Sequence, residues 1–393
     1  MRFVILNTDY PDFLAWLYAQ NPGLEEKSYD EQMRVRMDSL FGMADFYSSN
    51  LRQLGHEAWD VEISNEVMQK QWAREHGIGV EESSSPTPVL RKAVGRAVRW
   101  AGRTPLRYLR PLLRPLFGPR HNQPSWLIQV LAAQIKEYKP DVLWNQAMEG
   151  IHPDFLREIK PYARILVGQH AAPLPRRKDF GCYDLVVSSL PNFVEYFRRT
   201  GLRAEFHRLA FEPRILPCLA DRRAKIPVSF VGSLSRDHVS RLELLEYLCS
   251  RRELQVWARE ARTLPSRSSI RRCYMGDAWG IEMYRTLQSS KITLNHHIGV
   301  AGSYANNLRL FEATGVGTLL VTDWKQNLQQ MFEPGKEVVV YRSAEECAEL
   351  IQYYIEHEEE RAKIAAAGQA RTLRDHTYNV RMQEFIDIVG KYV

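Results

Sequence analysis

Arg309 and Glu312 lie three positions apart and could together bind a nucleotide. This spacing places both side chains on one face of a helix. A guanidinium can neutralise a diphosphate, and a carboxylate can accept hydrogen bonds from ribose hydroxyl groups. The polar loop before the pair adds candidate ligand-binding residues: Gly302, Ser303, Asn306 and Asn307. We therefore predict a nucleotide site here, with an ordinary surface ion pair as the alternative.

A second polar group follows the apolar run VSFV. Gly232 and Ser233 stand where a strand is expected to end and a helix to begin, so their backbone N–H groups are predicted to face a phosphate. His238 and Arg241 follow three positions apart in the expected helix 238–250 and could add positive charge. A simple turn is the alternative explanation for Gly232.

Adjacent histidines, His296 and His297, end the apolar run KITLN. Neighbouring side chains on a strand point to opposite faces, so at most one of them faces the predicted site. We favour His297 as a further binding residue. A histidine packed in the core is the alternative.

In the first half, ligands are expected at the carboxyl ends of parallel strands. His170 and Asp9 follow such runs and are candidate catalytic bases, since a histidine pKa suits proton transfer near neutral pH. A hydrogen-bonded loop residue is the alternative for His170, and a helix N-cap for Asp9. Candidate acceptor-side residues at the same strand ends are Asn7, Thr8, Asn145 and Gln169.

The sequence holds no DxD-like pair ending a strand, no HExxH motif and no Cys/His cluster. We therefore expect neither a bound metal nor a cofactor. GxSxG and GxxxxGK[ST] are also absent, which disfavours hydrolases and P-loop enzymes. The five cysteines are scattered, which favours a reducing cytoplasm. The N-terminal run RFVILN predicts a first strand and not a signal peptide.

Strand-like and helix-like runs alternate along the 393 residues, which predicts an α/β protein with two Rossmann-like domains whose parallel sheets face a cleft. The expected boundaries are an N-terminal domain over 1–212, a linker over 213–225 and a C-terminal domain over 226–378. A terminal helix over 379–393 is expected to pack back on the first domain.

The sequence also predicts the limits of individual helices. We expect one long helix over 31–54 and a helix over 326–332. The tail from Ala344 is expected to be helical with a break at Gly368.

A segment of different composition interrupts the first half at 81–120. Between Val89 and Arg120 it contains nine Arg or Lys residues and no acidic residue, interleaved with Trp, Leu and Phe. The chain has a net charge of +6, which favours anionic partners. We favour peripheral contact with an anionic membrane through 89–120, because this composition is typical of interfacial segments. A solvated arm and a nucleic-acid-binding arm are the alternatives.

Three motifs in fixed order resemble a known family. They are RLFEATGVGTLLVTD from Arg309, EPGKEVVVY from Glu333, and AGQAR followed by HTYNVR up to Arg381. Together they resemble the donor-binding half of GT-B glycosyltransferases of the "glycosyl transferases group 1" type, in their CgeB-like (spore maturation protein-like) branch. The resemblance implies a GT-B fold and metal-independent transfer of a sugar from a nucleotide-diphosphate donor. It implies a glycan, lipid-linked or protein acceptor, as in bacterial surface-glycan synthesis.

One position departs from the family pattern. Many retaining members carry two glutamates eight positions apart, of which the second matches Glu312. The first position is Tyr304 here. This departure leaves open whether transfer retains or inverts configuration, and it keeps a non-catalytic scaffold of the same fold at a membrane as an alternative. A GT-B nucleotide-sugar epimerase is a separate alternative.

Overall fold

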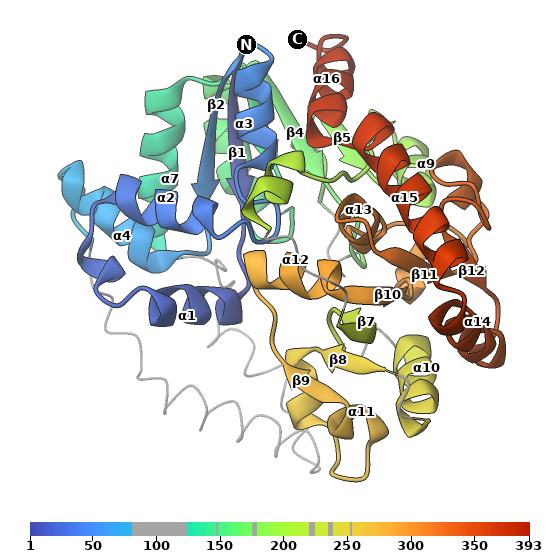
Figure 1. Ribbon diagram of the computed structural model, residues 1–393. Helices are drawn as coiled ribbons and strands as arrows, with labels where there is room; N and C mark the ends of the chain where they lie inside the picture. The colour runs from blue at the N-terminus through green and yellow to red at the C-terminus, as the bar shows by residue number, and fades with distance from the viewer. Residues whose placement is uncertain (81–123, 147, 175–178, 220–224, 235–238, 252–253) are drawn as a thin grey trace, which may run out of the picture.

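The computed structural model describes residues 1–80, 124–146, 148–174, 179–219, 225–234, 239–251 and 254–393. The described residues form two parallel sheets of six strands each (Figure 1), so the predicted α/β fold with two Rossmann-like halves is confirmed. The basic segment 81–120 and its expected membrane contact lie outside the described residues, and so does His238. No helix in the described ranges is long and apolar enough to cross a bilayer.

The first sheet has the strand order β2-β1-β3-β4-β5-β6. Its strands are β1 (Arg2–Asn7), β2 (Glu57–Glu62), β3 (Val142–Asn145), β4 (Ile165–Gln169), β5 (Leu185–Ser188) and β6 (Ala204–Phe206). Its helices are α1 (Pro11–Gln20), α2 (Tyr29–Asp38), α3 (Phe46–Gln53), α4 (Glu66–Glu75), α7 (Ser125–Tyr138), α8 (Pro153–Ile159) and α9 (Pro191–Arg199). The central strands are apolar runs covered on both faces, as parallel sheets require.

The second sheet has the order β12-β11-β10-β7-β8-β9. Its strands are β7 (Ile226–Val231), β8 (Gln255–Trp257), β9 (Tyr274–Gly276), β10 (Ser290–Asn295), β11 (Leu319–Asp323) and β12 (Val339–Tyr341). Its helices are α10 (Val239–Ser250), α11 (Ser269–Arg272), α12 (Ile281–Gln288), α13 (Arg309–Gly315), α14 (Ala344–Glu356) and α15 (Glu358–Asp375). The short edge strand β9 was not expected from the sequence.

The last helix, α16 (Tyr378–Val389), leaves the second half and lies beside α3 of the first (Figure 1). The Phe385 ring stacks on Trp144 of β3 with centroids 3.9 Å apart. Tyr378 packs against Phe46 and Tyr47 of α3 at 5.2 and 5.3 Å. The chain therefore crosses between the halves twice, and its C-terminal helix ties them together.

The single long helix predicted over 31–54 is wrong. The structure has α2 and α3 separated by a turn in which Leu40, Gly42 and Ala44 all have positive φ angles of 56°, 62° and 39°. Left-handed residues interrupt a right-handed helix. The turn brings Phe41 against Phe13 at 4.4 Å and Trp279 at 4.9 Å, contacts between distant segments that local periodicity does not report.

Two other helix limits also differ from the prediction. Only a 3-10 turn, Leu328–Gln330, forms within the expected helix 326–332. The tail breaks at His357 and His376, and α15 runs through Gly368 without a break. A Cβ at Gly368 would lie 2.4 Å from the Glu337 carbonyl oxygen, so this glycine permits close packing and does not end the helix.

Candidate functional site

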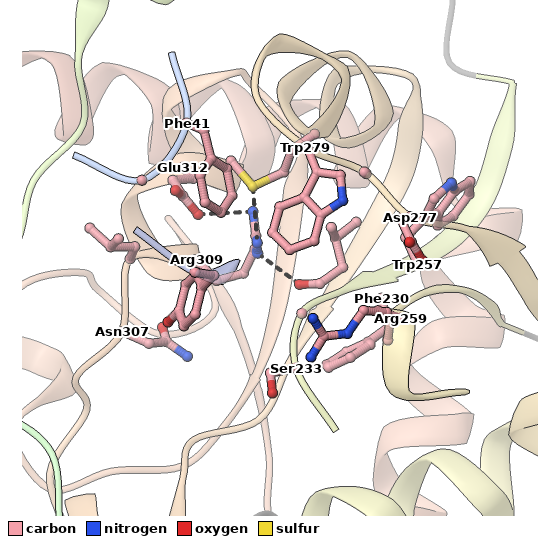
Figure 2. Close-up of a pocket in the computed structure, with 18 of the residues that line it drawn as sticks. Phe41, Phe230, Ser233, Trp257, Arg259, Asp277, Trp279, Asn307, Arg309 and Glu312 are labelled. Carbon is pink, nitrogen blue, oxygen red and sulfur yellow. Dashed lines mark hydrogen bonds and ion pairs between the residues drawn. The ribbon is translucent and has the colours of Figure 1, made fainter. Parts of the chain in front are cut away.

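A cavity of about 330 Å³ lies at the carboxyl ends of β7, β8 and β10, facing the first half of the chain (Figure 2). Strand ends at which crossover helices begin are where parallel sheets bind ligands. Six of the sequence-predicted residues line this cavity: Gly232, Ser233, Arg241, Asn307, Arg309 and Glu312. The first half contributes Tyr10, Phe41 and Gly42 to its rim.

Arg309, the first residue of α13, is held on three sides. Its Nη1 lies 2.8 Å from Glu312 Oε2, and its Nε donates to the Val231 carbonyl at 3.1 Å. Its Nη2 contacts Met283 Sδ at 3.4 Å (Figure 2). The Nη1 contact is an ion pair without hydrogen-bond alignment. The guanidinium is therefore fixed in position at the cavity wall, where it adds positive charge.

Glu312 lies on the same helix face and is 5% exposed. Burial raises the pKa of its carboxyl group, while the neighbouring Arg309 guanidinium lowers it. The Tyr284 hydroxyl donates to Oε1 at 3.5 Å. Arg309 thus provides the charge that favours Glu312 as a carboxylate, the form that accepts hydrogen bonds from hydroxyl groups.

Arg241 links the segments that follow β7 and β10 through hydrogen bonds. Its Nη1 donates to the Ser233 carbonyl at 2.8 Å, and its Nε and Nη2 donate to the His296 carbonyl at 3.1 and 2.5 Å. Burial lowers the pKa of Arg241 to about 10, which still leaves it charged at neutral pH. Its hydrogen bonds go to backbone carbonyls, so it shapes the cavity wall and adds a positive field.

Gly232 differs from its expected role in one respect. Its backbone N–H donates to the Trp257 carbonyl at 3.1 Å within the sheet, so this amide is not free for a phosphate. Helix α10 (Val239–Ser250) agrees with the predicted helix 238–250 to within one residue. Ser233 remains at the cavity, where its hydroxyl donates to Glu260 Oε1 at 3.0 Å.

The loop between β10 and α13 is tied to the segment after β11. Lys325 Nζ donates to the Gly302 carbonyl at 2.7 Å, and the Gln326 N–H donates to the Ser303 carbonyl at 3.0 Å. Gly302 has φ 56° and ψ −122°, a conformation that glycine tolerates best. Gly302, Ser303 and Asn306 lie outside the cavity lining. Asn307 does line it, and its Oδ1 accepts from the Leu310 N–H at 3.2 Å at the start of α13.

His297 is 2% exposed and also lies outside the lining. Its ring Nδ1 and its backbone N–H lie 2.6 and 3.0 Å from Asp323 Oδ1. Burial tends to raise the pKa of Asp323, but the His297 contact and nearby cations lower it well below the usual range. Tyr304 packs against the hydrophobic cluster of the first half instead of facing the cavity.

In the first half, Asp9 and Asn7 belong to a buried network. The Arg36 guanidinium donates to both carboxyl oxygens of Asp9 at 2.8 and 3.1 Å and lies 3.1 Å from Glu62. Asn7 Nδ2 donates to Asp60 at 2.9 Å and to Glu62 at 3.2 Å. Because the Arg36 guanidinium engages both carboxyl oxygens of Asp9, this geometry disfavours Asp9 as the group that receives a proton from an acceptor hydroxyl.

His170 is 4% exposed, and its ring lies 5.4–6.2 Å from the rings of Phe180, Phe193 and Phe197. Burial lowers its pKa, so the imidazole is neutral at physiological pH. It does not line the cavity. Asn145 is buried as well and donates to the Tyr183 hydroxyl at 2.7 Å, while Gln169 ends β4. Thr8 lines a separate, second cavity.

Several cavity residues were missed by sequence reasoning. Trp257, Arg259 and Asp277 come from the ends of β8 and β9, and Trp279 follows them (Figure 2). Arg259 forms an ion pair with Asp12 of α1 and lies 3.8 Å from Glu260. The available signal for Trp257 and Arg259 was their place at the end of the apolar run LQVW, whereas Asp277 and Trp279 follow β9, a strand that the sequence did not predict. Among the described residues, no group of three or more His, Cys, Asp or Glu side chains is placed to hold a metal ion.

Comparisons with known proteins agree with this architecture. Residues 214–387 match the family model described as "Glycosyl transferase-like". No curated protein sequence matches the chain. Similar solved structures include a glycosyltransferase from Rickettsia africae, with 12% identity, TM-score 0.53 and coverage of 99% of this chain and 98% of that one.

Two further structures resemble the whole chain. Anabaena HepE in complex with UDP-glucose has 13% identity and TM-score 0.55, with 100% of both chains covered. Sucrose-phosphate synthase from Thermosynechococcus elongatus has 10% identity and TM-score 0.54, covering 100% and 99%. The chain therefore has the GT-B fold, and its second half resembles the glycosyl transferase-like family.

Proposed function

We propose that this protein is a glycosyltransferase that binds a nucleoside diphosphate sugar in the cavity around Arg309 and Glu312. The observation that carries the proposal is the fixed Arg309–Glu312 pair at the start of α13, on the wall of a cavity between the two sheets. The match of residues 214–387 to the glycosyl transferase-like family supports it.

In this assignment, residues 226–378 hold the donor and residues 1–212 receive the acceptor. Arg309 contacts the diphosphate and Glu312 the ribose hydroxyl groups. The bond between the anomeric carbon and the diphosphate oxygen breaks, and the acceptor hydroxyl oxygen forms the new bond to that carbon. The electron pair leaves with the nucleoside diphosphate, and the hydroxyl proton goes to solvent.

A UDP-sugar is the first donor to test, because HepE, which shares the fold, has been solved with UDP-glucose. We expect UDP, GDP or dTDP to raise the melting temperature in the presence of EDTA. A ligand at one hundred times its Kd stabilises a protein by about 2.7 kcal/mol. Absence of any shift with all three nucleotides, with and without Mg²⁺, would contradict the proposal and favour the non-catalytic scaffold.

Product analysis distinguishes a glycosyltransferase from a nucleotide-sugar epimerase, the remaining alternative. The protein is incubated with UDP-glucose or UDP-N-acetylglucosamine without an acceptor, and the sugar is identified. A transferase releases UDP slowly by hydrolysis and leaves the configuration of the unreacted donor unchanged. Conversion to an epimeric nucleotide sugar would instead assign the protein as an epimerase.

We also propose, from the sequence alone, that residues 89–120 contact an anionic membrane, because this segment contains nine Arg or Lys residues. We expect the protein to bind vesicles containing anionic lipid more tightly than neutral ones, with affinity falling as salt rises. Deleting 89–120 should abolish this preference and spare UDP binding. Vesicle binding that survives the deletion would place membrane contact elsewhere.

A further inference from the structure

A small hydrophobic cluster lies beside the donor cavity, separate from the larger clusters of the two halves. Its buried members are Phe13, Leu17 and Leu24, from α1 and the 3-10 turn Leu24–Glu26 that follows it. Trp279, which precedes α12, packs against this cluster from the second half. Helix α1 therefore rests its apolar face on a residue of the other half.

The aromatic contact at the centre of this cluster joins three rings. The Trp279 ring meets Phe41 edge-on with centroids 4.9 Å apart, and its centroid lies 6.2 Å from that of Phe13. Phe13 and Phe41 stack on each other at 4.4 Å. Helix α1 and the turn 40–44 thus contact Trp279 as one unit.

Two neighbouring contacts support the aromatic one. Arg259 of the second half forms an ion pair with Asp12 of α1. At Gly280, a Cβ would lie 2.4 Å from the Ser39 carbonyl oxygen, so the two backbones come this close only because the residue is glycine. The two halves therefore meet here through side chains and backbone together.

This meeting point closes one side of the donor cavity. Phe41 and Trp279 both line the cavity, and so do Tyr10 and Gly42 of the first half. In Figure 2 the rings of Phe41 and Trp279 lie side by side, and Arg309 lies below them. A nucleotide bound at Arg309 would therefore be covered by α1 and the turn 40–44.

The covering part is anchored at both ends and strained at one of them. Arg36 donates to both carboxyl oxygens of Asp9, just before α1, and to the Ala44 carbonyl at 2.6 Å, at the end of the turn. Leu40 and Ala44 have positive φ angles of 56° and 39°. Such strain in residues other than glycine is found mainly at ligand clamps and switch regions.

The contact at Trp279 is less buried than the contact made by α16. Trp144 and Phe385, which join α16 to the first sheet, are both 0% exposed. Phe41 and Trp279 are both partly exposed. Because less apolar surface is removed from water at Trp279, this contact costs less free energy to break.

We propose that α1 and the turn 40–44 form a lid over the donor cavity, latched by Trp279, which opens to admit the nucleotide and to release it. The ends held by Arg36 stay on the first half while the lid leaves Trp279. A shut lid slows both entry and exit, so a weakened latch speeds both. This inference rests on the proposed donor site and specifies how that site opens.

The test measures the association and dissociation rate constants of UDP with the full-length protein by stopped-flow tryptophan fluorescence. Phe13→Ala removes an aromatic partner of Trp279, and Phe13 lies outside the cavity lining, so no ligand contact is lost. We expect both rate constants to rise by about two- to tenfold, the factor for the loss of one aromatic pair. Asp12→Asn, which removes the ion pair at an exposed position, should raise both by a smaller factor.

A matched variant makes the result specific. Phe193→Ala removes another buried phenylalanine of the first half, on α9 and outside the cavity lining, and should leave both rate constants unchanged. A rise in the dissociation rate constant alone would mean that the lid is only a wall of the cavity. Unchanged rate constants in folded Phe13→Ala and Asp12→Asn proteins would mean that the lid does not control entry. Either result overturns the inference.

A measurement without nucleotide separates this inference from the proposed function. In protein labelled with fluorotryptophan, the fluorine NMR resonance of Trp279 is assigned by its loss in Trp279→Phe. It should move toward the position of a solvent-exposed indole in Phe13→Ala and keep its place in Phe193→Ala. If wild type binds no UDP but this shift occurs, the proposed function fails and the latch stands. A Trp279 resonance that does not respond to Phe13→Ala would refute the latch.

Discussion

At the carboxyl ends of the strands, buried carboxyl groups have opposite pKa shifts in the two sheets. At the end of β11, Asp323 contacts His297 and lies 3.3 Å from Lys325, and its pKa is lowered well below the usual range. At the end of β2, burial raises the pKa of Glu62 well above its usual value, although the Arg36 guanidinium opposes this. Burial acts on both groups, and their neighbours decide the difference: His297 and Lys325 lower the pKa of Asp323, whereas Asp9 and Asp60 raise that of Glu62.

The two arginines show the same contrast. Arg36 is 3% exposed, and its donors are used by Asp9, Glu62 and the Ala44 carbonyl. Arg309 is also held, but its side chain is 13% exposed and lines the cavity. A helix arginine beside the strand ends thus stabilises buried carboxyl groups in one half and lines the cavity in the other.

The largest expected effect is on the stability of the first half. Arg36→Ala leaves the buried carboxyl group of Asp9 without its ion-pair partner, which costs about 3–5 kcal/mol. Denaturant unfolding measures it. Arg164→Ala removes an exposed arginine 3.6 Å from Asp141 and should cost less than about 1 kcal/mol. Equal losses in the two variants would refute the assignment of Arg36 to a buried network.

Asp323→Asn should destabilise the protein by about 1.5–3 kcal/mol at neutral pH, since it removes hydrogen bonds to a charged group. The folded-state pKa of Asp323 is lowered from 3.8, so its contribution is present above pH 3.8 and is lost as pH falls through the folded value. The deficit of the variant should therefore shrink in acid. A deficit independent of pH would show that Asp323 contributes by packing alone.

Glu62→Gln should have the opposite pH dependence. The folded-state pKa of Glu62 is raised above 4.5, so its stabilising contribution is present below pH 4.5 and is lost as pH rises toward the folded value. The glutamine side chain of the variant does not titrate, so its contribution to stability does not change with pH. Relative to wild type, the variant should gain stability with rising pH, by at most about 1.4 kcal/mol per pH unit. A relative loss at high pH would mean that Glu62 is charged in the fold.

His170→Asn is expected to have the smallest effect on function. The His170 ring lies among three phenylalanine rings outside the cavity, so we expect UDP affinity and turnover to change by no more than a few-fold. A general base would lower turnover by about a hundred- to ten-thousandfold. A drop of that size in a folded variant with normal UDP affinity would restore His170 as the catalytic base.

The sequence was sufficient to predict the sheets and part of the site. Apolar runs such as VSFV and TLLV form strands almost regardless of context, and the spacing of Arg309 and Glu312 places them on one helix face. The turn at Leu40 and the cavity position of Trp279 depend on contacts between the two halves, which no local pattern contains.

Polar residues at strand ends were the hardest to interpret. Asp9 and His170 occupy positions where ligands bind in parallel sheets, but one is held by Arg36 and the other by aromatic rings. The partner of Asp9 lies 27 residues away on α2. A strand-end position predicts proximity to a site, whereas availability for chemistry depends on partners that only the folded chain identifies.

The most direct test of the central claim is the affinity of Arg309→Ala for UDP, measured by calorimetry in EDTA. The exposed ion-paired Arg157, three residues after Asp154 on α8, provides the matched control Arg157→Ala. We predict that Arg309→Ala weakens binding by about 1.5–3 kcal/mol, the scale of a hydrogen bond to a charged group, and that the control binds as wild type does. Wild-type affinity in a folded Arg309→Ala protein would contradict the account.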